Sequence, residues 1–142
     1  MRSVFALLRD TTEAEVAAYL DRTYPSQPSP PWLMVGGDGP SLYIDFYREF
    51  SEYWAPEDRM DLTRRFGGEP AVAVIADVSG RIPGDEQAFE FLTGLLDHFS
   101  GAAMDDYTGH LWSIAELRAD HLVSGHRFFD YNGWYDERKT DD

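Results

Sequence analysis

Hydrophobic residues along this chain recur in two spacings, one typical of strands and the other of helices. Residues 41–47 alternate apolar and polar positions, which predicts a strand with two unlike faces. Short apolar runs bounded by turn residues predict further strands. These strands are expected at residues 4–9, 32–35, 71–78 and 102–107, the last continuing at 111–112. The glycine-rich residues 36–39 predict the turn of a hairpin that joins the second strand to the third.

Helical spacing and capping residues predict four helices, at residues 11–24, 56–66, 85–99 and 113–122. Thr12 with Glu15, and Ser113 with Glu116, have the three-residue separation of a capping box. Pro56 suits the first turn of a helix, where its missing N–H costs nothing. The helix at 85–99 has the clearest apolar face. The predicted buried stripe of this helix consists of Phe89, Leu92, Leu96 and Phe99.

The order of these elements predicts an α+β fold, with a single mixed sheet that contains a hairpin and has helices packed on it. The strand–helix–strand unit at 71–112 would be a right-handed crossover if its two strands are parallel. The length of 142 residues is that of one domain, expected at residues 1–135. Aromatic residues at 125–135 are expected to pack on this domain, and the acidic tail at 136–142 is expected to fray.

The charge of the chain narrows the classes of partner. There are 26 Asp and Glu against 12 Lys and Arg, a formal net charge of −14, and residues 82–117 contain no Lys or Arg. Such a field repels nucleic acid and anionic membranes and speeds encounter with a basic partner. The alternative is that the charge serves solubility. A hydrophobic content of 43% indicates a folded domain with the acidic residues on its surface.

Targeting and disulfide signals are missing from the sequence. There is no cysteine, which excludes disulfides and thiolate zinc sites. The first apolar run, at residues 4–8, is too short for a signal peptide, and no run approaches the length of a membrane span. A cytoplasmic protein that binds neither membranes nor nucleic acid is therefore expected.

No motif in the sequence establishes a reaction, so we expect no enzymatic activity and no catalytic residue. The four histidines lack the spacings of common zinc motifs, which predicts no metal and no cofactor. The alternative is a small enzyme or ligand-binding domain in which carboxylates and an imidazole perform acid–base chemistry or hold Mg²⁺ or Mn²⁺. Its candidate residues are Asp77, Asp105, Asp106 and His110. Adjacent strand residues point to opposite faces, so Asp105 and Asp106 would need a bulge to share a site.

Aromatic and acidic residues interleave in three segments, at residues 43–54, 105–112 and 129–136, and this pattern favours a surface for a protein partner. Tyr and Trp anchor many interfaces, and carboxylates around them would meet basic side chains of the partner. The predicted partner-binding residues are Tyr43, Asp45, Tyr47, Glu49, Glu52, Asp105, Asp106 and Tyr107. The alternatives are that these aromatic residues belong to the core or form the seam of a homodimer.

In size, charge and aromatic content the chain resembles the immunity proteins of bacterial polymorphic-toxin systems. It is also similar in general character to barstar-type inhibitors, although it is longer and has a hairpin after the first helix. The clusters at residues 43–52 and 105–112 carry the resemblance. The resemblance implies a cytoplasmic protein that occludes the active site of a basic toxin domain.

Overall fold

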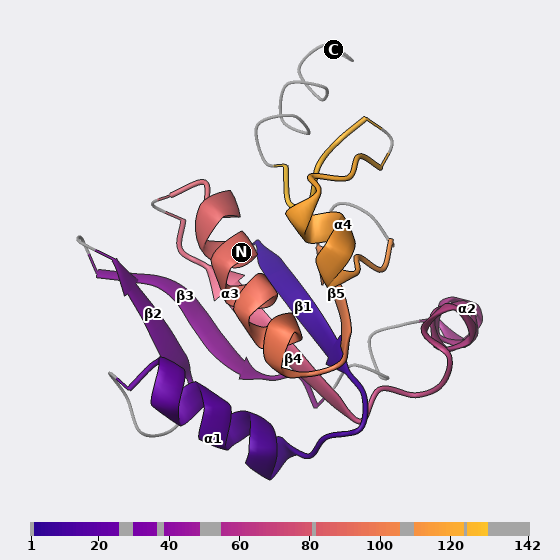
Figure 1. Cartoon of the computed structure of the whole chain (residues 1–142), viewed down its shortest axis with the longest axis horizontal. Helices are drawn as coiled ribbons and strands as arrows, with labels where there is room; N and C mark the ends of the chain where they lie inside the picture. Colours follow the sequence, from indigo (N-terminus) through magenta and orange to yellow (C-terminus); the bar gives the residue numbers. More distant parts are fainter. Residues whose placement is uncertain are drawn as a thin grey trace.

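The described part of the chain is built around one sheet (Figure 1). The structure is a computed structural model that describes residues 2–25, 30–36, 39–48, 55–80, 82–105, 110–123 and 125–130. The sheet has five strands in the order β2-β3-β4-β1-β5. The strands are β1 (Ser3–Leu8), β2 (Trp32–Gly36), β3 (Gly39–Phe46), β4 (Val72–Val78) and β5 (Gly101–Asp105).

The predicted α+β class is confirmed, with a hairpin of β2 and β3 and helices packed on the sheet. The prediction of a mixed sheet is wrong, because every neighbouring pair of described strands is antiparallel. The strands β4 and β5, which flank α3 in the chain, do run in the same direction. However, β1 lies between them and pairs with both, which is the split β-α-β arrangement.

Three helices lie over one face of the sheet and bury its main core. They are α1 (Glu13–Thr23), α3 (Asp85–His98) and α4 (Ile114–Arg118). On this face the strands contribute alternate residues, among them Val4, Ile44 and Val74, all without exposed surface. The alternation predicted for residues 41–47 is confirmed, since Leu42 and Ile44 are buried whereas Tyr43 points to the opposite face.

The fourth helix, α2 (Pro56–Phe66), belongs to the other face of the sheet. Its Leu62 and Phe66 pack with Leu7 and Met104, over the β1–β5 side. Figure 1 shows α2 standing apart from the other helices. The part of this face formed by β3 and by the second half of β4 is not in the cluster that α2 buries.

The buried stripe of α3 differs in phase from the prediction. Leu92 and Leu96 are buried as expected, but Phe89 is 37% exposed and Phe91 is 1% exposed. The stripe that contacts the core consists of Ala88, Phe91, Leu92, Leu95 and Leu96. These positions follow the i, i+3, i+4, i+7, i+8 rule better than the predicted set does, because the predicted set included Phe89 in place of Phe91.

The N-terminal caps of the helices were predicted more accurately than the helix lengths. The Thr12 hydroxyl accepts a hydrogen bond from Glu15 N–H, and Ser113 with Glu116 forms a complete capping box. The helix α2 begins at Pro56. The helix α4 was expected to reach residue 122, but it ends at Arg118, and Asp120 has a positive φ of 51°. The expected tail at 136–142 lies outside the described residues.

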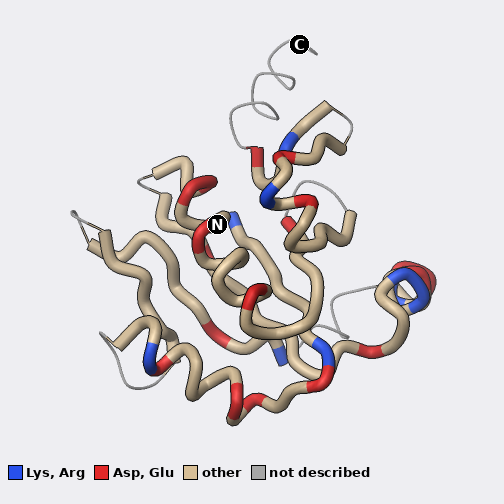
Figure 2. The backbone as a smooth tube through the Cα atoms, in the orientation of Figure 1, with Lys and Arg blue, Asp and Glu red and all other residues tan. Residues whose placement is uncertain are grey.

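Charged positions are distributed unevenly along the described backbone (Figure 2). Acidic residues occur on all the helices, whereas basic residues gather on α2, which carries Arg59, Arg64 and Arg65. Among the described helices, none combines the length and apolar character that crossing a bilayer requires.

Candidate functional site

The sheet face opposite α1 and α3 brings together three of the predicted partner-binding residues. Tyr43 and Asp45 are alternate residues of β3 and point to this face, where Tyr43 lies across from Leu33 of β2 and from Asp77 of β4. Asp45 lies across from Ile75. We call this group the acidic sheet patch, and it consists of Leu33, Tyr43, Asp45, Ile75 and Asp77.

The side chains of the patch are accessible but held in place. Tyr43 is 37% exposed, and the other members are partly exposed. The Asp77 carboxylate accepts a hydrogen bond from the Ser3 hydroxyl at 2.6 Å, and Asp45 accepts one from the Phe46 N–H at 2.7 Å. Strand pairing on both sides of β3 and β4 fixes their backbone. The patch is therefore a preorganised surface, with a ring and two carboxylates on a rigid support.

Tyr47, the third of these residues, follows β3 and is partly buried. Its ring packs against Phe5 with centroids 5.4 Å apart, beside the cluster that contains Leu62 and Phe66 of α2. Its backbone N–H donates to the Ala73 carbonyl. Tyr47 therefore joins the patch to the packing under α2.

Asp105 lies on the other face of the sheet from this patch. It is 3% exposed, and its carboxylate accepts a hydrogen bond from the Phe129 N–H at 2.8 Å. This burial takes Asp105 away from any surface that a partner could reach and gives it a role in holding the segment after α4. The other predicted partner-binding residues lie outside the described part of the chain, namely Glu49, Glu52, Asp106 and Tyr107.

Among the described members of the alternative catalytic group, the structure separates Asp77 from Asp105. Asp77 pairs with Ser3 and Asp105 pairs with Val4, and these neighbouring residues of β1 point to opposite faces. Asp77 and Asp105 are therefore separated by the sheet. The fourth member, His110, contacts a different carboxylate, that of Glu116.

A cluster of two imidazoles and one carboxylate forms around α4, and sequence analysis missed it. His110 precedes the helix, Glu116 lies in its first turn, and His121 follows it. The Nε2 atoms of His110 and His121 lie 3.1 Å and 3.3 Å from the same oxygen, Oε2 of Glu116. The spacing of six and five residues matches no common motif, because the helix and the turn after it bring the groups together.

The other oxygen of Glu116 belongs to the helix cap. Its Oε1 accepts the Ser113 N–H at 2.9 Å, which orients the carboxylate so that Oε2 points to both imidazoles. Burial by itself would raise the pKa of Glu116. The hydrogen bonds from Ser113 and His110, together with the charges of the two histidines when protonated, outweigh burial and lower this pKa below its ordinary value.

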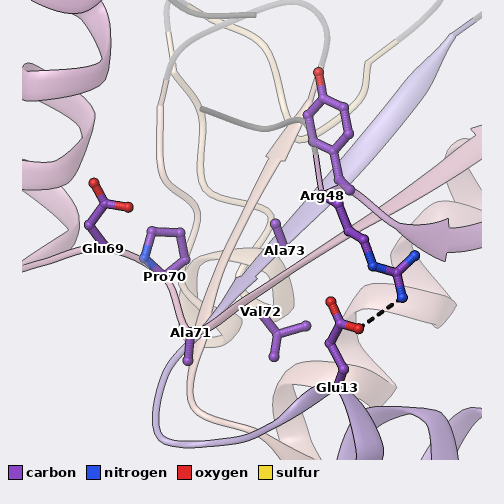
Figure 3. A pocket seen from close by; sticks show the side chains of 8 residues that line it. Glu13, Arg48, Glu69, Pro70, Ala71, Val72 and Ala73 are labelled. Carbon is purple, nitrogen blue, oxygen red and sulfur yellow. Dashed lines mark hydrogen bonds and ion pairs between the residues drawn. The ribbon is translucent and has the colours of Figure 1, made fainter. Parts of the chain in front are cut away.

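A pocket of about 250 Å³ lies where β3 ends and β4 begins, and it has no catalytic arrangement among its described lining residues (Figure 3). Its charged residues are Glu13, Arg48 and Glu69. Arg48 is paired with Glu13 at 2.8 Å, and both side chains are largely exposed to solvent. Such an exposed pair contributes little to stability. None of the described residues that line this pocket has an imidazole.

The fold and these sites define an α+β protein with one antiparallel sheet. An acidic sheet patch lies on one face, and a His–Glu–His cluster lies around α4, one of the helices on the other face. Comparison with protein-family models, curated proteins and solved structures found no match for this chain.

Proposed function

We propose that this chain is a non-enzymatic protein-binding module, and that it acts as an immunity protein that binds and occludes a basic bacterial toxin. The single observation that carries this proposal is the acidic sheet patch. It presents a tyrosine that is 37% exposed, beside two carboxylates, on a rigid pair of strands. A tyrosine surrounded by acidic groups is the composition expected of an anchor for a basic protein surface.

The layout of the fold supports the choice of this face. The opposite face is occupied by α1, α3 and α4, and α2 covers the β1–β5 side of the patch's own face. The described residues of the strands that point to this face include no Lys or Arg. The described residues of the strands therefore present no repulsive side chain to a positively charged partner, whereas α2, on the same face, carries Arg59, Arg64 and Arg65.

The mechanism would combine steering with steric occlusion. A net charge of −14 accelerates encounter with a basic protein, because long-range attraction raises the association rate. Once docked, Tyr43 would fill a pocket of the partner, and Asp45 and Asp77 would accept hydrogen bonds from its Arg or Lys side chains. The bulk of the sheet would then exclude substrate from the toxin's active site.

The test begins with affinity capture from the source organism at low salt, followed by identification of the bound protein by mass spectrometry. The purified partner should slow bacterial growth when expressed alone, and coexpression of this chain should restore growth. Association measured by surface plasmon resonance should slow as salt rises from low to physiological, where screening acts over about 8 Å.

Matched variants locate the surface. Tyr43→Ala should raise the dissociation rate about 30-fold, which corresponds to an anchor worth about 2 kcal/mol. Asp45→Asn should lower mainly the association rate. The controls are Met60→Ala and Asp58→Asn on α2, both exposed and outside the patch.

Equal binding by the patch variants and the wild type would refute this surface, and a partner without toxicity would refute the immunity role. A stable homodimer in light scattering that Tyr43→Ala dissociates would assign the patch to self-association instead.

A further inference from the structure

We infer that His110, Glu116 and His121 form a binding site for a divalent transition-metal ion such as Zn²⁺. The inference is independent of the proposed function. It rests on one juxtaposition: a nitrogen from each imidazole and an oxygen of the carboxylate lie within 4.8 Å of one another.

The two distances between the imidazole nitrogens and the carboxylate oxygen fit a zinc site. In a tetrahedral site with metal–ligand bonds of about 2.0–2.1 Å, neighbouring ligand atoms lie about 3.3 Å apart. The two nitrogen–oxygen distances in the cluster are 3.1 Å and 3.3 Å. Small movements of the side chains would therefore place an ion between the three atoms without rebuilding the backbone.

The chemistry of the ligands narrows the choice of ion. Two imidazoles and one carboxylate form a known zinc ligand set, and imidazole suits Zn²⁺ and related transition metals better than Mg²⁺ or Ca²⁺. Glu116 supplies the carboxylate of such a set, with its Oε2 close to the Nε2 atoms of both imidazoles. The described residues supply three ligands, which leaves a tetrahedral ion one position for water or another group.

The surroundings hold the ligands in place. The indole of Trp112, only 1% exposed, packs nearly perpendicular to both imidazoles, with centroids 4.9 Å from His110 and 6.1 Å from His121. The Ser113 N–H fixes the second oxygen of Glu116. Such outer contacts orient metal ligands and strengthen binding. Arg118, the cation of α4, pairs with Asp97 at 3.2 Å.

A bound ion would stabilise α4 by connecting the residues on either side of this helix. Its ligands come from before, within and after this five-residue helix, which is too short to be stable without tertiary support. An ion that binds the folded state but not the unfolded state would raise the midpoint of thermal unfolding. We expect zinc to strengthen the docking of α4 on α3, where the Arg118–Asp97 pair already connects the two helices.

The test uses the full chain without a polyhistidine tag, freed of metal by chelator and titrated with ZnCl₂ in a calorimeter at pH 7.5. We expect about one ion bound with a dissociation constant below about 10 μM. Co²⁺ serves as a second probe, since its visible absorption reports the coordination number. Zinc should also raise the thermal midpoint of the wild type.

Variants of the three residues test whether the cluster is a metal site or only a set of hydrogen bonds. His110→Asn and His121→Asn should each weaken zinc binding more than about 100-fold, beyond the loss typical of outer-contact changes. Glu116→Gln keeps an acceptor for the Ser113 N–H but loses the anionic ligand, so it should weaken binding at least about tenfold. His98→Asn, an exposed histidine on α3, is the matched control and should bind as the wild type does.

Circular dichroism of each variant without metal establishes that it is folded. The inference is overturned if the wild type binds zinc more weakly than the stated limit, or if the three cluster variants bind as well as the wild type. An equal loss in His98→Asn would overturn it as well.

Discussion

At the scale of single residues, α3 shows how neighbouring aromatic side chains of one helix divide between core and surface. Phe91 is 1% exposed and contacts Tyr24, the residue that follows α1, with centroids 6.0 Å apart, whereas Phe89 is 37% exposed. Phe91→Ala should therefore lower the free energy of unfolding by about 3–5 kcal/mol, the cost of removing a buried ring. Phe89→Ala should lower it by less than about 1 kcal/mol. Urea denaturation of both variants measures the difference, and similar losses would mean that the phase of α3 is wrong.

Asp105 offers a second test at this scale, because a buried carboxylate is expensive unless it is satisfied. Asp105→Ala would deprive the fully buried Phe129 N–H of its acceptor, which should cost about 1–3 kcal/mol of stability. Asp105→Asn keeps an acceptor oxygen and should cost less. Thermal and urea denaturation would decide. No loss in Asp105→Ala would show that the segment around Phe129 is not held by this carboxylate.

At the scale of elements, the capping box of α4 depends on pH. The pKa of Glu116 is lowered in the folded protein, so its ionised form stabilises the fold above its ordinary pKa of about 4.3. This contribution is lost as the pH falls through the lower folded value. The stability advantage of the wild type over Glu116→Gln should therefore be present above about pH 4.3 and shrink as the pH falls below this value.

Ser113→Ala removes the other half of the same capping box and is compared with the wild type at neutral pH. It removes the hydroxyl that accepts the Glu116 N–H and should cost about 1 kcal/mol. Denaturation curves recorded from pH 3 to pH 7 measure both effects. An advantage of the wild type over Glu116→Gln that grows as the pH falls would contradict the sign of the pKa shift.

The pairing of β1 with β5 depends on a close approach of two backbones. A Cβ atom at Gly101 would lie 2.1 Å from the carbonyl oxygen of Leu7, so the strands would have to separate. Gly101→Ala should destabilise the protein by at least about 1–3 kcal/mol, the usual cost of overpacking. Gly80→Ala is the control, because nothing lies within 4 Å of a Cβ there, and its effect should stay within about 0.5 kcal/mol. Equal stability of the two variants would contradict the observed register.

At the scale of the whole molecule, the net charge of −14 acts on stability as well as on partners. Like charges held in a compact body repel one another, and at 0.1 M salt this repulsion is largely screened between charges more than about 10 Å apart. The free energy of unfolding should therefore rise as NaCl increases from 20 to 200 mM, in contrast to the expected slowing of partner association. Urea denaturation at each salt concentration tests this, and a fall in stability would show that local ion pairs outweigh the overall repulsion.

The sequence by itself determined the elements and the α+β class, because both depend on short-range patterns. Alternation at residues 41–47 marked β3, and the Ser113–Glu116 spacing marked the start of α4. The excess of acidic residues is a property of composition. Tyr43 and Asp45 were correctly placed on the same strand face, since side chains of a strand alternate with a period of two.

Only the tertiary structure decided the strand order, the phase of α3 and the groups that meet in space. Each depends on pairing between distant segments. The insertion of β1 between β4 and β5 made the sheet antiparallel and put Asp77 and Asp105 on opposite faces. Packing on the sheet chose Phe91 over Phe89 for the core. The His110–Glu116–His121 cluster forms because α4 ends at Arg118 and the chain then turns, which brings His121 back to Glu116. No local spacing in the sequence predicts that turn.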